Sequence, residues 1–349
     1  MPVSSPLRRR LPLLALALVL TAGPGLRPAA AQDCKDGMRK INIGVSVTPP
    51  NVVHTTPFVA KALGFFAKHC VDAEIMQFEG AASPAAKAAI AQGSVIINLS
   101  DVAIGRGLKA QQFWGIAPRL PQVYAVAADI KTAADLKGRK LSASGGGVGG
   151  FQWRMAREVL RTANLTIDDA QFISQGTAGR VPGLVAGQVD GVALHPEDMH
   201  LAIEKNPKLH PLLDLSKLLP NFVFNVYAAS SDRIARDRVL LRDTAAAMIE
   251  ANRTIYRDKE KVVPIIAEAS KRPKESVAYA WDVLTRNCVW SVNEGFTPER
   301  TQWTIDYDVS IGDLDQAHKP TVEQVFNLAL AREAVEAAGG RVSIGNCKE

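Results

Sequence analysis

The sequence predicts an α/β protein of two similar lobes, each built on a parallel sheet, followed by a helical C-terminal part. Three observations carry this prediction: short apolar strands alternate with helical segments, the same order of elements occurs twice, and residues from Arg236 onward follow helical spacing almost throughout. Strands that alternate with helices favour a parallel sheet with right-handed crossovers. A repeated unit indicates two lobes of one architecture.

The first unit alternates strands and helices from Ile41, and the second repeats this order from Arg139. In the first unit, apolar runs predict strands at 41–47, 72–78 and 94–100 and helices at 56–69, 83–92 and 101–110. In the second unit, we expect strands at 139–144, 170–175, 190–195, 209–215 and 221–230 and helices at 150–164, 178–188 and 196–206. The C-terminal part has helical spacing at 236–256, 258–270, 273–287, 297–314 and 321–340.

Two segments carry the chain between the lobes in this arrangement. A strand near residues 122–129 crosses into the second lobe and a strand near residues 222–230 returns from it, which makes a hinge of two chain segments. The expected domains are a leader at 1–31, a first lobe made of 32–126 and 231–349, and a second lobe at 127–230. The C-terminal helices are then expected to pack on the first lobe.

The start of the chain has the features of a secretory signal peptide. Arginines at 8–10 form a basic start, residues 11–20 are an apolar run, and alanines at 29–31 make a small-residue cleavage site. We expect cleavage after these alanines and a periplasmic protein. The apolar run is far shorter than the ~20 residues that span a bilayer. Asp33 stands before Cys34, where a lipid-attachment signal needs a small residue.

The basic balance of the chain belongs largely to this leader. The formal net charge is +6, from 41 Lys and Arg against 35 Asp and Glu. Residues 1–31 hold four of the arginines and no acid, so the rest of the chain has 37 basic and 35 acidic residues. This balance gives no reason to expect a nucleic acid or an anionic membrane as a partner.

The chain has four cysteines, Cys34, Cys70, Cys288 and Cys347. No two of them have C-x-x-C spacing, which disfavours a zinc cluster or a redox pair. In an exported chain they are expected to form one or two disulfides, and three pairings are possible. All four lie outside residues 128–230, so disulfides would join parts of the first lobe and leave the hinge free.

A glycine-rich turn, SASGGGVGGF, follows the strand at 139–144. Its glycines at 145, 147 and 150 match the G-x-G-x-x-G pattern of a dinucleotide-binding turn. The acidic residue of such a site follows the next strand, but Asp168 and Asp169 precede it here, and no Lys-Ser or Lys-Thr of a P-loop follows the glycines. The turn therefore predicts no nucleotide. Free N–H groups at the start of the Phe151 helix favour a bound anion instead, and the alternative is a flexible loop without a ligand.

Two stretches carry a resemblance to a known family. Residues 132–194 contain an Asp-Leu-Lys-Gly lead-in, the glycine turn and a helix that ends in VAGQVDG, and residues 56–75 contain an A-x-x-x-G-F-F helix before the second strand. They resemble periplasmic solute-binding proteins of ABC importers in the nitrate, sulfonate and taurine class, whose structural family includes binding proteins for pyrimidine precursors of thiamine. The resemblance implies a type II periplasmic-binding-protein fold that closes around a solute by hinge motion.

This resemblance implies a ligand at the carboxyl ends of the strands of both lobes, as is general for open α/β sheets. The candidates in the first lobe are Thr48, Pro49, Asn51, His54, Ala81, Ala82, Ser83 and Ser100. Those in the second lobe are Ser144, Gly146, Gly147, Val148, Gly149, Thr177, Arg180 and His195, and the return strand adds Asn225. Phe151 or Trp153 would provide an aromatic wall, although such residues on an amphipathic helix more often belong to the core.

No motif in the chain predicts catalysis. His195 and His200 are five residues apart, which places them about 140° apart on a helix, so they do not share a metal as residues four apart do. The chain contains no G-x-S-x-G elbow and no paired carboxylates at matching strand ends. We expect neither a cofactor nor a metal.

We therefore expect an exported receptor rather than an enzyme. It is expected to bind a small organic anion, a sulfonate or a carboxylate, and to deliver it as a monomer to the permease of an ABC transporter. The aromatic residues beside the glycine turn favour an aromatic carboxylate. Two other interpretations stay open: a pyrimidine-precursor binding protein or related enzyme, and a ligand sensor that docks onto a periplasmic signalling partner.

Overall fold

The computed structural model describes residue 1 and residues 34–81, 83–97, 100–144 and 147–347. The chain divides into two units, Met1–Ala31 and Gln32–Glu349, and every described helix and strand belongs to the second. The predicted leader and its cleavage site lie outside the described residues. None of the described helices combines the length and the apolar character needed to cross a membrane.

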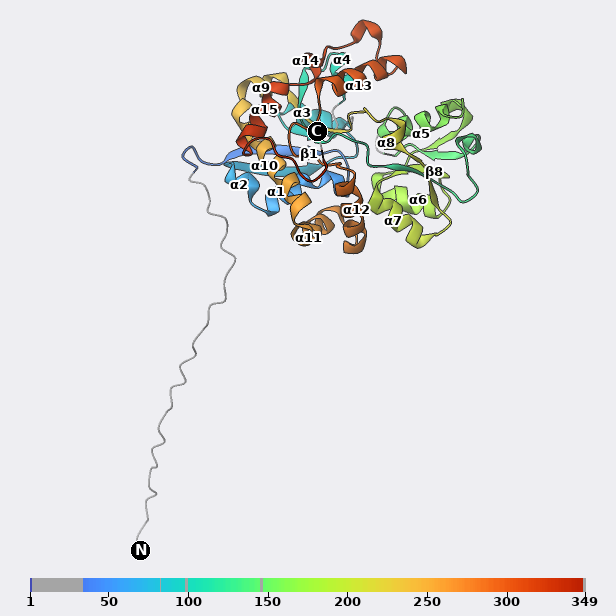
Figure 1. Cartoon of the computed structure of the whole chain (residues 1–349), viewed down its shortest axis with the longest axis horizontal. Helices are drawn as coiled ribbons and strands as arrows, with labels where there is room; N and C mark the ends of the chain where they lie inside the picture. Colours follow the sequence, from blue (N-terminus) through green and yellow to red (C-terminus); the bar gives the residue numbers. More distant parts are fainter. Residues whose placement is uncertain (2–33, 82, 98–99, 145–146, 348–349) are drawn as a thin grey trace. The chain divides into compact units, whose positions relative to one another are not determined.

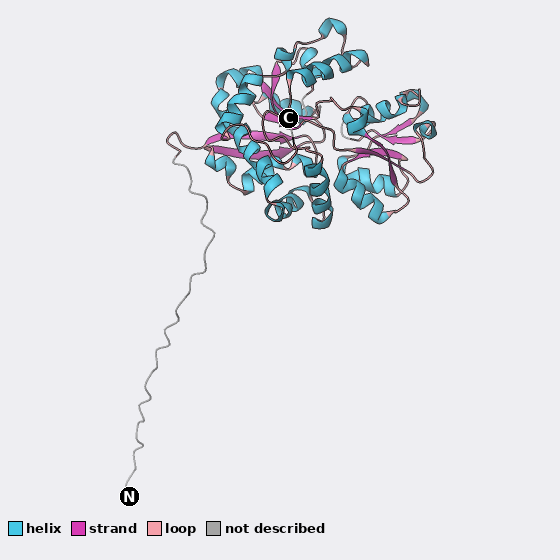
Figure 2. Ribbon diagram, viewed as in Figure 1, coloured by secondary structure: helices cyan, strands magenta, loops and turns pink. Residues whose placement is uncertain are grey.

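The described strands form one sheet in each lobe, as predicted, and each sheet has five strands (Figures 1 and 2). The first sheet has the order β2 (Val71–Gln77), β1 (Arg39–Val45), β3 (Val95–Ile97), β10 (Asn225–Ser230) and β4 (Ala110–Ala117). The second has the order β7 (Gln171–Ile173), β6 (Lys140–Ser142), β8 (Gly191–Leu194), β5 (Val123–Val126) and β9 (His210–Asp214).

Both sheets are mixed rather than parallel, which corrects the prediction. Strand β1 pairs in parallel with β2 and β3, and β6 with β7 and β8, but β10 and β5 run antiparallel to their neighbours. The reason is that β5 and β10 each follow a segment that arrives from the other lobe. Such a strand enters its new sheet at the carboxyl edge and therefore runs against the parallel strands. Strand β4 was not predicted, because its two glutamines interrupt the apolar run.

The chain crosses between the lobes slightly earlier than predicted. Strand β5 belongs to the second sheet and β10 to the first, so the crossing segments are residues 118–122 and 219–224. Both lie before the expected lobe boundaries at 126/127 and 230/231. The strands that were expected to form the hinge are therefore parts of the sheets themselves.

The helices cover both sheets, and the C-terminal part is helical as predicted (Figure 1). The first lobe contains η1 (Val52–His54), α1 (Thr56–Ala62), α2 (Phe65–Lys68), α3 (Pro84–Ala91) and α4 (Asp101–Gly105). The second contains η2 (Ala133–Leu136), α5 (Phe151–Arg161), η3 (Ile167–Asp169), η4 (Thr177–Gly179), α6 (Arg180–Val185), α7 (Pro196–Lys205) and α8 (Leu215–Leu218). The C-terminal part contains α9 (Ser231–Arg236), α10 (Arg238–Arg257), α11 (Lys259–Ser270), α12 (Lys274–Arg286), α13 (Pro298–Ser310), η5 (Gln316–His318), α14 (Val322–Val325) and α15 (Leu328–Ala337).

Helix α10 packs the C-terminal part against the first lobe. It packs against α1, α2 and α15, and its middle, from Thr244 to Ile249, is buried. The expectation that these helices pack on the first lobe is met, but two of them also reach the second lobe. Helix α12 packs against α7, and α13 carries an ion-pair partner of α5. The C-terminal part therefore contributes to the contact between the lobes.

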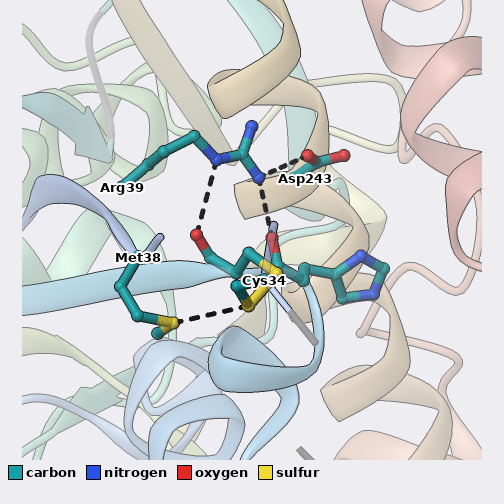
Figure 3. Close-up of a disulfide and its surroundings, with 6 residues drawn as sticks. Cys34, Met38, Arg39 and Asp243 are labelled. Carbon is teal, nitrogen blue, oxygen red and sulfur yellow. Dashed lines mark hydrogen bonds and ion pairs between the residues drawn. A yellow bond between two sulfur atoms is a disulfide. The ribbon is translucent and has the colours of Figure 1, made fainter. Parts of the chain in front are cut away.

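The cysteines form two disulfides, Cys34–Cys70 and Cys288–Cys347. The first ties the segment before β1 to the turn before β2 (Figure 3). Beside it, the Arg39 guanidinium donates to the Asp243 carboxylate at 2.7 Å, so the same region is also bonded to α10. Neither disulfide involves the second lobe, as predicted, and neither joins the two lobes.

Candidate functional site

A cavity of about 420 Å³ lies between the lobes, at the carboxyl ends of the parallel strands. Both lobes, both crossing segments and the C-terminal helices contribute to its wall. It is lined by Ser46, Val47, His54, Gly80, Ala81, Ser100, Asp101, Arg106, Gln112, Gln122, Val148, Gly149, Gly150, Phe151, Arg154, Arg180, His195, Phe222, Val223, Phe224, Val226, Thr301, Thr304 and Val325. This is the position at which open α/β sheets bind ligands.

A larger recess of about 1090 Å³ contacts the same crossing segments through different residues. It is lined by Pro118–Pro121 and Leu219–Asn221, whereas Gln122 and Phe224 line the smaller cavity. The larger recess includes neither the buried histidines nor the buried arginine of the second lobe. The buried histidines and the buried arginine that could bind a ligand therefore line the smaller cavity, although its volume is less than half that of the larger recess.

Arg180 is a buried cation in the wall of this cavity. It begins α6 in the second lobe and is only 6% exposed. Its Nε donates to the Ser144 hydroxyl at 2.9 Å, but it forms no ion pair with a carboxylate of the described residues. Burial lowers the pKa of Arg180, and Asp198 and Glu79 oppose this without reaching ion-pair distance. A buried guanidinium without a counter-charge is costly.

Two buried histidines lie beside one another in the same part of the cavity. His54 ends η1 after the first strand, His195 precedes α7 after the third strand of the second lobe, and their ring centroids are 5.5 Å apart. Burial, followed by the charge of Arg180, lowers the pKa of His54 to about 3, and burial holds that of His195 well below its usual value. Both rings are therefore neutral at neutral pH.

These histidines leave polar atoms unused. Among the described residues, neither ring nitrogen of His54 has a hydrogen-bond partner of normal geometry, although the Asn225 side chain is close enough to act on its pKa. The Gln122 amide nitrogen donates to Nε2 of His195 at 3.0 Å, so the proton of this neutral ring is on Nδ1, which has no partner. Buried polar atoms are rarely left without partners. No group of three or more His, Cys, Asp or Glu in the described part of the chain is arranged to hold a metal ion.

Three phenylalanine rings continue the wall away from the histidines. Phe151 begins α5, and Phe222 and Phe224 belong to the segment that returns from the second lobe. The Phe224 ring lies 6.0 Å from that of His54 and 5.3 Å from that of Phe151. Phe224 therefore lies between the polar part of the cavity and the rest of its aromatic wall. Trp153 does not line the cavity.

The other charged part of the wall is neutralised within the protein. Arg154 of α5 forms ion pairs with Asp308 of α13 and with Asp313 at 2.9 Å, and Arg157 donates both Nη groups to Asp313. Burial and the neighbouring Asp101 raise the pKa of Asp308 to about 8, which Arg154 opposes. Asp101 therefore disfavours the ionisation of Asp308. This network joins the second lobe to the C-terminal helices.

A second network joins the lobes on the side of α7. The Asn51 amide donates to Glu197 at 2.9 Å and to Asp198 at 2.8 Å, and the backbone N–H of Val52 donates to Glu197 at 2.9 Å. Arg272 donates to Asp198 at 2.8 Å. Burial and the neighbouring Asp198 raise the pKa of Glu197 to about 7. These contacts hold the lobes together around the cavity.

The structure brings part of the predicted site together. The predicted residues that line the cavity are His54, Ala81, Ser100, Val148, Gly149, Arg180 and His195. Those that do not line it are Thr48, Pro49, Asn51, Ser83, Ser144, Gly147, Thr177 and Asn225. Ala82 and Gly146 lie outside the described residues.

Several residues outside the cavity wall have other contacts. Ser83 caps α3 by accepting from the backbone N–H of Ala86 at 3.2 Å. The Thr177 hydroxyl donates to Glu79 at 3.0 Å and so bridges the lobes. Asn225 is buried beside His54 and opposes the lowering of the His54 pKa by burial.

The sequence interpretation missed much of the wall. Gln122, Phe222 and Phe224 lie on the crossing segments, whose sequence does not show which side faces a cavity. Arg154 follows Phe151 by three residues, and this helical spacing places both on one face, which is a signal that could have identified it. Its partner Asp308 is 154 positions away and has no signal in the sequence.

Residues 51–261, more than half of the chain, match the NMT1/THI5-like family. In structure the chain is similar to the periplasmic aliphatic sulphonate binding protein SsuA from Escherichia coli, with 20% identity, a TM-score of 0.63, and coverage of 82% of this chain and 96% of SsuA. It is similar to the periplasmic nitrate-binding protein NrtA from Synechocystis PCC 6803, with 16% identity, a TM-score of 0.65, and coverage of 86% and 89%.

An enzyme shares this fold as well. The desulfurization enzyme DSZB has 14% identity and a TM-score of 0.62, with coverage of 85% of this chain and 99% of DSZB. No curated protein matches the sequence significantly. At these identities the structural likeness establishes the fold alone. The chain belongs to the NMT1/THI5-like family, and its two lobes have the α/β fold of the periplasmic binding proteins.

Proposed function

We propose that the protein is an exported receptor that binds a small organic anion in the cavity between its lobes. The observation that carries this proposal is Arg180, a buried cation in the cavity wall that no carboxylate of the described residues neutralises. An anion in the cavity would supply the missing charge and accept hydrogen bonds from the guanidinium. The neighbouring histidines would supply further N–H groups.

The size of the cavity favours an anion with an organic body. Its 420 Å³ is many times the ~30 Å³ that one water molecule occupies in the liquid. A small inorganic anion would leave most of this space, including the aromatic wall, without contacts. The volume is within the range of small-molecule sites, which is roughly 300 to 1,000 Å³. A sulfonate or a carboxylate with an apolar body meets both requirements.

The arrangement of the lobes supports capture of the ligand by closure and its delivery to a partner. The two crossing segments would act as a hinge, and the networks of Arg154 and Asn51 would form when the lobes close on the ligand. The fold shared with SsuA and NrtA supports delivery to the permease of an ABC transporter. After removal of the leader the protein would act in the periplasm as a monomer.

We propose binding without turnover, although the fold also occurs in the enzyme DSZB. The Ser100 hydroxyl accepts from the backbone of α4, and the Thr304 hydroxyl bonds to two backbone groups. No cavity histidine hydrogen-bonds a hydroxyl in the described part of the chain, so the wall offers no activated serine or threonine. The four cysteines are in disulfides.

The test is a thermal-shift screen of the protein purified after export, with carboxylates, sulfonates, nitrate and pyrimidines as probes. A ligand at one hundred times its dissociation constant adds about 2.7 kcal/mol to the free energy of unfolding, which raises the melting temperature by several degrees. We expect an organic anion to do so and to be recovered unchanged. Binding of an uncharged pyrimidine alone, or conversion of the ligand, would contradict the receptor proposal.

A further inference from the structure

The charged groups around the cavity separate into two ends. The charged neighbours of Arg180 include Asp198 and Glu79, whereas Asp101 has Asp308 beside it. Arg180 and Asp101 line the same cavity from different lobes, since Arg180 begins α6 of the second lobe and Asp101 begins α4 of the first. A ligand in the cavity therefore meets the cation Arg180 and, separately, the carboxyl group of Asp101, whose neighbour Asp308 does not line the wall.

Among the described residues, Arg180 is the one cation of the cavity wall that is buried and forms no ion pair with a carboxylate. Arg154 is matched by Asp308 and Asp313. Arg106, the third arginine of the wall, is exposed and donates to the backbone oxygen of Asp313. A ligand with one negative group at Arg180 is therefore balanced. A second negative group would find no free cation to balance it, because Arg154 is already matched by Asp308 and Asp313.

The free part of Arg180 suits a group with two oxygens. Its Nε is committed to the Ser144 hydroxyl, so the two Nη groups are left to face a ligand. Two parallel N–H bonds from these groups match the two oxygens of a carboxylate. The third oxygen of a sulfonate lies outside the plane of these two bonds, so the guanidinium does not bind it.

The rings beside Arg180 favour a ligand whose planar ring is bonded directly to the carboxylate. Phe224 lies 6.0 Å from the His54 ring and 6.1 Å from the His195 ring, so aromatic and polar surfaces are continuous. Phe151 extends the wall at 5.3 Å from Phe224. Stacked or edge-to-face arrangements of rings add to the burial of apolar area. A ligand with a long flexible chain between its carboxylate and its ring would place the ring away from Phe224.

We propose that the ligand is a planar aromatic monocarboxylate whose ring is attached directly to the carboxylate, and that Phe224 selects the flat ring. This inference rests on the proposed function, because it assigns the class of anion to the same cavity. It excludes inorganic anions, dicarboxylates and saturated acids of similar size as preferred ligands.

The experiment measures dissociation constants by calorimetry for pairs of probes that differ in one property. Benzoate and 2-naphthoate are compared with cyclohexanecarboxylate and decahydro-2-naphthoate, with benzenesulfonate, and with the dianion terephthalate. We expect each aromatic acid to bind about tenfold more tightly than its saturated counterpart, and more tightly than the sulfonate. Terephthalate is expected to bind at least tenfold more weakly than benzoate.

The matched variants are Phe224→Leu and Phe172→Leu. Phe172 is half-buried in β7 of the second lobe and packs against Trp153 away from the cavity wall, so it controls for general loss of packing. Phe224→Leu should reduce the ratio of aromatic to saturated affinity to about one, and Phe172→Leu should leave this ratio unchanged. A ratio that Phe224→Leu does not alter would contradict the selecting role of this ring.

The outcomes distinguish this inference from the proposed function. If alkanesulfonates or saturated acids bind best and depend on Arg180, the receptor proposal stands and the aromatic class is wrong. If terephthalate binds as well as benzoate, the single-charge argument is wrong. If no anionic probe binds at all, both proposals fail together.

Discussion

Arg180 and Arg154 both belong to the second lobe and both line the cavity, but their surroundings differ. Arg154 faces Asp308 and Asp313, which come from the C-terminal part. Arg180 is more completely buried in the wall and has only the Ser144 hydroxyl as a hydrogen-bond acceptor in the described part of the chain. The comparison teaches that residue type alone does not identify a ligand contact. The arginine that the protein neutralises holds the lobes together, and the one that it leaves unpaired is available for a ligand.

Arg180→Gln is the variant from which we expect the largest effect, because it removes the arginine that we propose binds the anion. We expect this variant to lose about a thousandfold in affinity for an identified anion, because one charged partner of a buried pair is worth roughly 2 to 5 kcal/mol. Burial lowers the pKa of Arg180, so the folded protein disfavours its charge. The empty variant should therefore melt no lower than the wild type. Calorimetry and melting curves with and without ligand test both parts.

Arg154→Gln is the matched control for this variant, since it removes the same charge from the same cavity wall. It should retain the preference for anions over neutral analogues. Equal losses of affinity in both variants would mean that the two arginines have the same role.

The next largest effect is expected from breaking the ion pairs of Arg154. Arg154→Gln leaves Asp308 buried without its cation, and the loss of one partner of a buried pair costs about 3 kcal/mol of unfolding free energy. The double variant Arg154→Gln with Asp308→Asn should recover much of this loss, because it also removes the stranded carboxyl group. A double-mutant cycle from urea unfolding at about pH 9, above the pKa of Asp308, measures the coupling. Losses that simply add would show that the pair does not hold the lobes together.

The same two arginines show what the sequence could and could not predict. The alternation of strands and helices, the position of the cysteines outside the second lobe and the helix that begins at Phe151 were predictable, because each depends on local pattern. The placement of Arg180 and His54 in one wall followed from the rule for strand ends. The pairing of Arg154 with Asp308 was not predictable, since it depends on how a C-terminal helix meets the other lobe.

The predicted residues that lie outside the wall have a related explanation. Asn51 and Thr177 do follow strand ends, but their side chains reach carboxylates of the opposite lobe rather than the cavity. Strand order places a residue near the cleft and does not decide whether it contacts a ligand or the other lobe. Phe224 was missed for the opposite reason, because a crossing segment has no periodic pattern that identifies its inner side.

The pH dependence of stability should separate the two ends of the cavity. The pKa of His54 falls from 6.5 to about 3 on folding, so the unfolded chain binds a proton first and stability falls as the pH drops from 6.5 towards 3. At pH 5 the free energy of unfolding should be lower than at pH 7 by about 2 kcal/mol because of His54. His54→Gln should remove this part of the dependence, as measured by urea unfolding at both pH values.

The carboxyl end should behave in the opposite way. The pKa of Asp308 rises from 3.8 to about 8 on folding, so its contribution to stability is lost as the pH rises through this range. Asp308→Asn should therefore flatten the curve at the alkaline side and leave the acid side unchanged. If His54→Gln and Asp308→Asn change the stability curve over the same pH range, the two groups do not titrate independently and the separation of the two ends is refuted.

The smallest effect is expected in the glycine turn, where two glycines differ in a single property. Gly147 and Gly149 have φ values of +68° and +81°, and an added Cβ would meet no heavy atom within 4 Å at either position. Each replacement by alanine should therefore cost about 1 kcal/mol of stability through backbone strain alone. Only Gly149 lines the cavity, so only Gly149→Ala should also change the affinity for the anion. If Gly147→Ala changes the affinity as strongly, the turn affects binding through its conformation, and the ligand does not need close approach to the backbone at Gly149.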